Sequence, residues 1–252
     1  MIRLTHVGGP TTLIEVGGRR LLTDPTLDPP GRRYTFGWGG ASRKLAGPAL
    51  APEALLPLDA VLLTHDHHAD NLDDAGRALL PSAGTVITTR SGGERLGCTG
   101  LAPWETTALE AEPGRPRLEI TATPCRHGPP GFHPIVGDVI GFALRWDGGS
   151  LWITGDTVLY GAVREAAARV ASDVMLLHLG AVRFGVTGPL HYTLTARDAV
   201  ALCDLARPRV VVPVHYEGWS HFSQGRSDVE AAFAGSAHDQ RWIPTGEAAE
   251  IP

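Results

Sequence analysis

Short apolar runs alternate with glycine- and proline-rich breaks along the 252-residue chain. Runs of this length, rich in Val, Ile and Leu and bounded by turn residues, are typical of β-strands. The Gly17-Gly18 pair between two such runs predicts a hairpin with a two-residue turn. The segments predicted as strands are Ile2–Val7, Thr12–Val16, Arg19–Thr23, Asp59–Thr64, Thr85–Thr89, Leu118–Thr123, Val139–Trp146, Leu151–Thr154, Asp173–His178 and Val210–Val214.

Several of these strands are followed by stretches whose apolar residues recur at helical spacing. The clearest is Thr195–Ala206, which is amphipathic and carries Asp198 in its first turn, where a carboxylate interacts favourably with the helix dipole. The segments predicted as helices are Leu72–Leu80, a short stretch near 93–97, Ala162–Val170, Thr195–Ala206 and Asp228–Phe233.

A proline- and glycine-rich stretch, residues 25–57, interrupts this pattern and contains the scattered aromatic residues Tyr34, Phe36 and Trp38. A loop of this length in a compact domain is usually either functional or disordered. We therefore expect this segment to form one wall of a substrate site.

The order of the elements predicts the architecture. Each half of the chain begins with a hairpin and continues with strand–helix units. This order predicts an α/β (α+β) fold in which two mixed sheets pack face to face with helices outside, in two related halves. Because no linker or repeat divides the sequence, we expect one domain over residues 1–252.

Composition and charge exclude several classes of function. A net charge of −5 and a pI of about 6.1 argue against a nucleic-acid partner, since phosphate neutralisation requires a basic surface. No stretch approaches the roughly 20 apolar residues of a membrane helix, and the N-terminus lacks a signal-peptide pattern. We therefore expect a cytoplasmic protein with no membrane partner. The cysteines, Cys98, Cys125 and Cys203, are too widely spaced to suggest a disulfide framework.

The densest polar cluster follows the apolar Asp59–Thr64 strand and reads His65-Asp66-His67-His68-Ala69-Asp70-Asn71. In α/β proteins this junction between a strand and a helix is a common place for a functional site. An irregular loop allows imidazoles and a carboxylate that are close in sequence to converge on one ion. We therefore interpret the cluster as part of a metal site.

Three further ionisable residues stand at the ends of apolar strands. His127 follows the Leu118–Thr123 strand, Asp156 follows Leu151–Thr154, and His215 follows Val210–Val214. Combined with the first cluster, they supply imidazoles and carboxylates, one of which could bridge two ions. This inventory is typical of a dinuclear metal site.

The order of these features resembles the metallo-β-lactamase superfamily over nearly the whole chain. The opening segments, residues 7–15 and 21–25, resemble its metal-dependent hydrolase branch. That branch includes L-ascorbate-6-phosphate lactonase-like proteins and N-acyl phosphatidylethanolamine phospholipase D. The resemblance implies a four-layer αββα sandwich with a metal site at one edge of the sheets. It also implies metal-ligand roles for His65, His127, His215 and, as a bridging carboxylate, Asp156.

The first motif departs from the family form, His-x-His-x-Asp-His. Because the chain has one extra residue after His65, the second ligand is either His67 or His68. Asp70 matches the aspartate of the motif in both alignments, and Asn71 stands in place of its last histidine. Asn71 offers a metal a weak neutral oxygen at most, which puts the second metal position in question, or it caps the following helix.

Four other residues are predicted to lie around the metal site. Asp24 ends a strand, where it either orients a ligand imidazole or forms a turn. His178 ends another strand, and a structural position in the core is the simpler interpretation. By the same resemblance, His191 lies at the rim of the site, where it would donate a proton or bind an oxyanion. His221 is expected to line the pocket.

Together these features predict a metal-dependent hydrolase with one or two Zn²⁺ or Mn²⁺ ions per chain. Such an ion lowers the pKa of its bound water from about 15.7 to about 7. The resulting hydroxide, held near Asp156, would attack a small-molecule ester, lactone or phosphodiester. The predicted catalytic residues are Asp70, Asp156 and His191.

Two other classes of function stay open. One is a redox enzyme with a mononuclear iron, although iron is the less favoured metal. The other is a metal-binding protein without turnover, which the replacement at Asn71 would explain. The resemblance is also compatible with a homo-oligomer.

Overall fold

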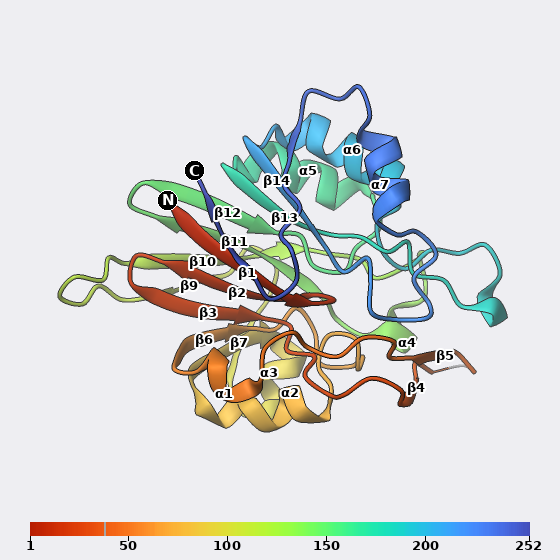
Figure 1. The fold of residues 1–252 in the computed structure, drawn as a ribbon, viewed down its shortest axis with the longest axis horizontal. Coiled ribbons are helices and arrows are strands. Elements are labelled where there is room, and N and C mark those ends of the chain that lie inside the picture. Colours follow the sequence, from red (N-terminus) through yellow and green to blue (C-terminus); the bar gives the residue numbers. More distant parts are fainter. Residues whose placement is uncertain (38) are drawn as a thin grey trace.

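The computed structural model describes residues 1–37 and 39–252, and its centre is a pair of seven-stranded sheets (Figure 1). Trp38, one of the aromatic residues predicted to line a substrate wall, lies outside the described residues. The first sheet has the order β16-β1-β2-β3-β6-β7-β8. Its strands are β1 (Ile2–Gly8), β2 (Thr11–Val16), β3 (Arg19–Thr23), β6 (Leu58–Leu62), β7 (Ala83–Thr89), β8 (Thr99–Leu101) and β16 (Ala248–Ile251).

The second sheet has the order β15-β14-β13-β12-β11-β10-β9. Its strands are β9 (Thr106–Leu109), β10 (Leu118–Pro124), β11 (Ile140–Trp146), β12 (Gly149–Ile153), β13 (Val174–His178), β14 (Val210–Val214) and β15 (Asp239–Gln240). Each sheet has an antiparallel part followed by a parallel part, as in β1-β2-β3 followed by β6-β7-β8. The predicted similarity of the two halves is visible in this arrangement. The last strand, β16, returns to pair with β1.

Helices cover the outer faces of the two sheets (Figure 1). The helices α1 (Pro52–Leu55), α2 (Asp74–Leu79) and α3 (Arg90–Leu96) lie beside the first sheet, and α5 (Gly161–Val170), α6 (Ala196–Ala206) and α7 (Arg226–Phe233) lie beside the second. Between the sheets, apolar side chains from both, such as Leu4, Ile14, Phe142 and Val212, form a buried core. The predicted fold of two mixed sheets with outer helices is confirmed.

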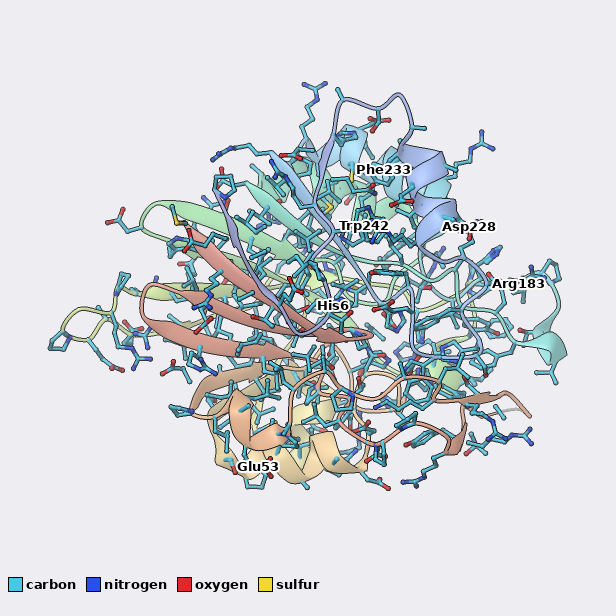
Figure 2. The ribbon with its side chains drawn as sticks, viewed as in Figure 1. His6, Glu53, Arg183, Asp228, Phe233 and Trp242 are labelled. Carbon is cyan, nitrogen blue, oxygen red and sulfur yellow. The ribbon has the colours of Figure 1, made fainter. Side chains whose placement is uncertain are left out.

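A separate apolar cluster fixes the helices of the second half. Val163 and Leu202 pack with Phe233 of α7 and with the partly buried Trp242, and Figure 2 labels the last two beside the helices of the second half. Helix α6 begins with a reciprocal cap in which Thr195 and Asp198 bond each other's backbone N–H groups. Such a cap contributes about 1 kcal/mol. Within the described residues, no helix combines the length and apolarity required to cross a membrane.

Residues 25–57, predicted as a long loop, contain short elements of their own. The hairpin strands β4 (Arg33–Thr35) and β5 (Ala41–Arg43) pair with each other, and α1 closes the segment. The pattern of the sequence does not reveal three-residue strands because they depend on pairing rather than on an apolar face. The remaining short elements are α4 (His133–Val136), η1 (Leu80–Ser82) and η2 (Gly185–Thr187).

A buried ion pair holds this segment against the first half of the fold. Lys44 Nζ lies 2.7 Å from Asp73 Oδ2, and both side chains are almost fully buried. Asp73 also accepts backbone N–H bonds from Leu27, Asp28 and Gly76. The Gly76 bond caps helix α2, which therefore begins at Asp74 and not at Leu72 as predicted.

Candidate metal centre

The ionisable residues singled out in the sequence stand where four strands of the two sheets end. His65 follows β6, His127 follows β10, Asp156 follows β12 and His215 follows β14. Strands β10 and β12 are each antiparallel to β11, which lies between them, so they run in the same direction. Their carboxyl ends therefore reach the same edge of the second sheet.

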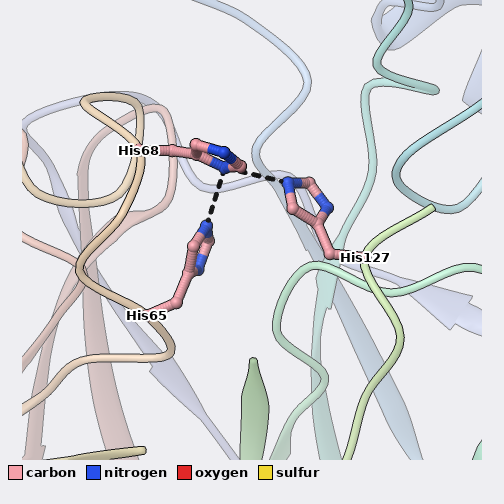
Figure 3. A group of neighbouring side chains, drawn as sticks. All are labelled: His65, His68 and His127. Atoms are coloured by element: carbon pink, nitrogen blue, oxygen red, sulfur yellow. Dashed lines mark hydrogen bonds between the residues drawn. The ribbon is translucent and has the colours of Figure 1, made fainter. Parts of the chain in front are cut away.

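Three imidazoles form the first group of potential ligands, shown in Figure 3. The Nδ1 atom of His68 lies 3.3 Å from Nε2 of His65 and 3.1 Å from Nε2 of His127. The Nδ1 atom of His127 lies 2.8 Å from the main-chain oxygen of Tyr192. Because a carbonyl oxygen can only accept, this contact places the proton of His127 on Nδ1 and leaves the Nε2 lone pair directed at the group.

Burial keeps these imidazoles neutral at physiological pH. Desolvation lowers the pKa of His68 to about 4 and that of His127 to about 3, and holds the pKa of His65 well below its usual value. Three neutral imidazoles whose nitrogens converge suit a borderline metal ion such as Zn²⁺. Their ligand atoms all lie within 4.8 Å of one another.

Asp70, Asp156 and His215 form a second group, again with ligand atoms within 4.8 Å of one another. His215 lies between the two carboxylates, with Nδ1 3.5 Å from Asp156 Oδ1 and Nε2 3.7 Å from Asp70 Oδ2. Burial disfavours the charged form of His215, yet Asp156 and Asp70 raise its pKa to about 9. Burial also raises the pKa of Asp156 to about 7, whereas the neighbouring imidazoles of His215 and His221 outweigh the effect of burial and lower the pKa of Asp70.

The second group suits a cation for two reasons: it contains two carboxylates, and some of its buried polar atoms lack hydrogen-bond partners. Among the described residues, Asp156 Oδ1 and His215 Nε2 are buried and have no hydrogen-bond partner. Buried polar atoms without partners are costly, and a bound cation would satisfy both of them. Two carboxylates in a water-excluded position also repel each other unless a cation or proton lies between them.

The structure brings His68 and not His67 to the first group. The side chain of His67 is 28% exposed, and its Nδ1 lies 3.6 Å from Asp66 Oδ1, outside both groups. The extra residue of the motif therefore precedes His68. Arg95 of α3 donates two hydrogen bonds to the carboxylate of Asp66 and so holds this part of the loop away from the first group.

Asn71 is buried beside the second group and does not cap α2, whose N-cap is Asp73. With its amide oriented to donate, Nδ2 lies 3.3 Å from Asp156 Oδ2 and 3.3 Å from the main-chain oxygen of Asp70. In this orientation the amide nitrogen, and not the oxygen that could bind a metal, faces the Asp156 carboxylate. The contact therefore assigns Asn71 to holding Asp156.

Asp24 connects the strand ends beneath the two groups. Its Oδ1 accepts from the backbone N–H of Thr64 at 2.7 Å and from the Thr64 hydroxyl at 3.0 Å. Its Oδ2 lies 3.3 Å from Nε2 of His178. Asp24 thus fixes Thr64, the residue before His65. Asp24 and His178 belong to neither group of ligands, and they hold the strand ends that carry the groups.

His191 lies apart from both groups, although it was predicted at the rim. Its side chain is partly exposed, and the charged neighbours that influence its pKa are Arg183, labelled in Figure 2, and Asp198. The next residue, Tyr192, approaches the site instead, with its ring 6.0 Å from that of His127. His221, in contrast, reaches the second group, with Nε2 2.9 Å from Asp70 Oδ2.

A narrow apolar cleft leads to His68 and His127, and most of its wall was not predicted. Its apolar lining residues are Phe36, Phe132, Ile135, Val136, Phe184, Val186 and Tyr192. Only Phe36 belongs to the aromatic residues singled out in the sequence. A larger cavity of about 290 Å³ also contacts His127 and shares Val136 with the cleft. The other lining residues come from loops and from the short elements α4 and η2, which contain no chemical motif, so the sequence carries no signal for them.

Comparison of the chain with known proteins identifies its family. The family model for the Beta-lactamase superfamily domain matches residues 19–216, and the chain belongs to this family. A UPF0173 metal-dependent hydrolase from Pyrococcus furiosus is 27% identical over 229 residues, which cover 87% of this chain and 86% of that protein.

Two solved structures are similar over almost their full length and show the metallo-β-lactamase fold. One is a possible metal-dependent hydrolase from Veillonella parvula, with a TM-score of 0.83, 20% identity and 99% of both chains covered. The other is an isothiocyanate hydrolase from Delia radicum gut bacteria, with a TM-score of 0.81 and 20% identity. That match covers 99% of this chain and 98% of the other.

The lowered pKa values make a prediction for the metal-free protein. A histidine whose pKa is lower in the folded state contributes stability above its unfolded value of about 6.5, and this stability is lost as the pH falls toward the folded value. The lowered pKa values of His65, His68 and His127 therefore reduce the stability as the pH falls. The raised pKa of Asp156 has the opposite effect, because this one carboxyl binds its proton more tightly in the folded state. We therefore expect the melting temperature to fall between pH 6.5 and about 4.5.

Thermal melts of the chelator-treated protein at several pH values would measure this effect. A His68→Asn variant should show a shallower decline, because one of the three histidines is removed. A melting temperature that stays constant or rises on acidification would contradict the assignment of neutral, buried imidazoles.

Proposed function

We propose that the chain is a metal-dependent hydrolase whose metal centre is built from the two groups. His65, His68 and His127 would hold one ion, and Asp70, Asp156 and His215 a second. Asp156 would bridge the two, as in the family that the chain resembles. The observation that carries the proposal is the convergence of six buried ligand side chains from four strand ends into two groups.

The donor set favours Zn²⁺ or Mn²⁺. Imidazoles suit zinc, and the carboxylates of the second group also suit a harder ion such as manganese. When bound, such an ion supplies a water whose pKa is lowered to about 7, which gives a nucleophile at neutral pH. The hydrogen bond that Asn71 donates to Asp156 and the one that His127 donates to the main-chain oxygen of Tyr192 would hold Asp156 and His127 in place.

The cleft favours an uncharged substrate, and we propose a small ester or lactone. Its described lining residues comprise apolar and aromatic side chains, Gly, Thr and two histidines, with no lysine or arginine among them. A phosphodiester carries a negative charge that such a wall would leave uncompensated.

His191 has no place in this proposal, because it does not line the cleft and belongs to neither group. Protonation of the leaving group therefore falls to water in the site.

A substrate panel tests the proposal. The metal-loaded protein is expected to hydrolyse p-nitrophenyl butyrate and γ- and δ-lactones with a kcat/KM at least about 10-fold above that for bis(p-nitrophenyl) phosphate. An uncharged isothiocyanate should be included, because it is the substrate named for one structural relative. Preference for the phosphodiester would contradict the substrate class, and no turnover of any substrate would contradict the enzyme.

Val186 offers a way to change this preference without touching a metal ligand. It lines the cleft and is 63% exposed, so a charged side chain should be tolerated there. Val186→Arg is expected to raise kcat/KM for the phosphodiester by about 10-fold relative to the neutral ester. Val186→Gln is the matched control of similar length without charge. Equal ratios in the two variants would show that substrate does not approach through this cleft.

A further inference from the structure

We propose that His221 supplies an imidazole to the second metal position, in place of the histidine that the family motif would have at position 71. The inference rests on the metal centre of the proposed function. Asn71 stands where the family motif has a metal-binding histidine, which leaves the second metal position one ligand short. In this proposal His221, from a loop distant in sequence, replaces the missing ligand. His221 lies beyond the end of β14, in the same loop as His215.

The position of His221 is the first argument. Its Nε2 lies 2.9 Å from Asp70 Oδ2, and His215 Nε2 lies 3.7 Å from the same oxygen. Ligands at about 2.0–2.2 Å from one tetrahedral ion lie roughly 3.3–3.6 Å from each other. The two distances lie on either side of that range. Asp70 thus stands between two imidazole nitrogens, one slightly closer and one slightly farther than neighbouring ligands of one ion.

The lack of any other partner is the second argument. The side chain of His221 is 2% exposed. Among the described residues, neither of its ring nitrogens makes a hydrogen bond of acceptable geometry, despite the proximity of Asp70. A buried imidazole usually has at least one hydrogen bond. A metal ion at the second position would satisfy the nitrogen that faces Asp70.

Aromatic rings hold the imidazole in this place. Phe184 stacks on it at a centroid distance of 5.3 Å, and the rings of Phe36 and Phe222 lie at 5.1 and 4.7 Å. These neighbours offer no polar atom to His221. They restrict the orientation of the ring, which lowers the entropy cost of binding a metal.

The amide nitrogen of Asn71 donates to Asp156 and to the main-chain oxygen of Asp70. The side chain at the family's ligand position thus orients a carboxylate, and His221 provides the nitrogen. A family histidine at position 71 and His221 would then serve the same purpose, which makes them exchangeable.

Metal content and affinity measure the proposal without any substrate. We expect two Zn²⁺ per chain in the wild type after reconstitution and dialysis, and one in His221→Ala. His221→Gln should also retain one, since its amide can hydrogen-bond Asp70 but is a poor ligand. The double variant Asn71→His/His221→Ala should regain the second ion. His238→Ala, which changes a histidine paired with Asp204 far from the motif, should keep two.

Replacement by Co²⁺ gives a spectroscopic readout of the same variants. The visible absorption of the second equivalent should disappear in His221→Ala and return in the double variant. Two tightly bound ions in His221→Ala with unchanged affinity, or only one in the wild type, would overturn the proposal. A wild type with two ions and no hydrolysis would instead contradict the proposed function and leave the role of His221 intact.

Discussion

Replacing His68 with alanine is expected to remove bound metal and to lower kcat/KM for an ester or lactone by more than about 100-fold. Loss of a residue that merely orients a ligand typically costs 10–100-fold, so loss of a ligand should cost at least as much. His68 occupies the middle of the first group, with nitrogens of His65 and His127 at 3.3 and 3.1 Å. Both neighbours would lose the ion that they share with it.

His67→Ala is the matched control for this variant. The two histidines are adjacent in sequence, yet the His67 side chain faces Asp66 and solvent. We expect His67→Ala to retain its metal content and most of its activity. Elemental analysis and steady-state kinetics of both variants would decide the matter. Loss of metal in His67→Ala with retention in His68→Ala would show that the motif aligns the other way.

Replacing Lys44 with methionine is expected to lower the free energy of unfolding by about 3–5 kcal/mol. Removing one partner of a buried ion pair leaves the other charge in a poorly solvated position. Lys44 is the only lysine of the chain, and its ammonium group lies 2.7 Å from Asp73. Methionine has a similar length, so the loss of charge outweighs any loss of packing.

Urea denaturation of the metal-loaded protein would measure this loss. Arg241→Met, which removes an exposed pair with Asp239, should leave the midpoint unchanged. Because Lys44 anchors the segment that carries Phe36, the variant should also show a raised KM for the ester. Equal midpoints for Lys44→Met and the wild type would show that the buried pair contributes nothing to stability.

Much of the site was predictable because its residues stand directly after strands that are buried on both faces. Such strands are continuous apolar runs, as in Val210–Val214, and the first polar residue beyond them marks the edge of the sheet. His65, His127, Asp156 and His215 were all found in this way. The pairing of two related halves followed from the order of the elements.

The sequence could not distinguish His67 from His68, since the choice depends on how an irregular loop turns. The partly buried contact of Asp66 with Arg95 fixes that path, and it joins residues far apart in the chain. The role of Asn71 was equally hidden, because its contact with Asp156 arises only in the folded protein. The same holds for the Lys44–Asp73 pair and for the aromatic cleft.

Short edge strands such as β8 and β15 also escaped prediction. Their residues carry little apolar periodicity, and pairing with a neighbouring strand is what makes them strands. The boundary of α2 was misplaced for a related reason. Asp73 accepts from three backbone N–H groups and from the ammonium group of Lys44, and three of these four donors lie in the distant 25–57 segment.

Elemental analysis of the purified and reconstituted protein tests the central claim most directly. The account predicts two equivalents of zinc or manganese per chain, which should be lost when His127 and Asp156 are both replaced by alanine. Metal content unchanged by that double replacement, or no metal retained by the wild type, would contradict a centre built from these groups. Iron accompanied by oxygen consumption and no hydrolysis would contradict the hydrolase and favour redox chemistry at the same residues.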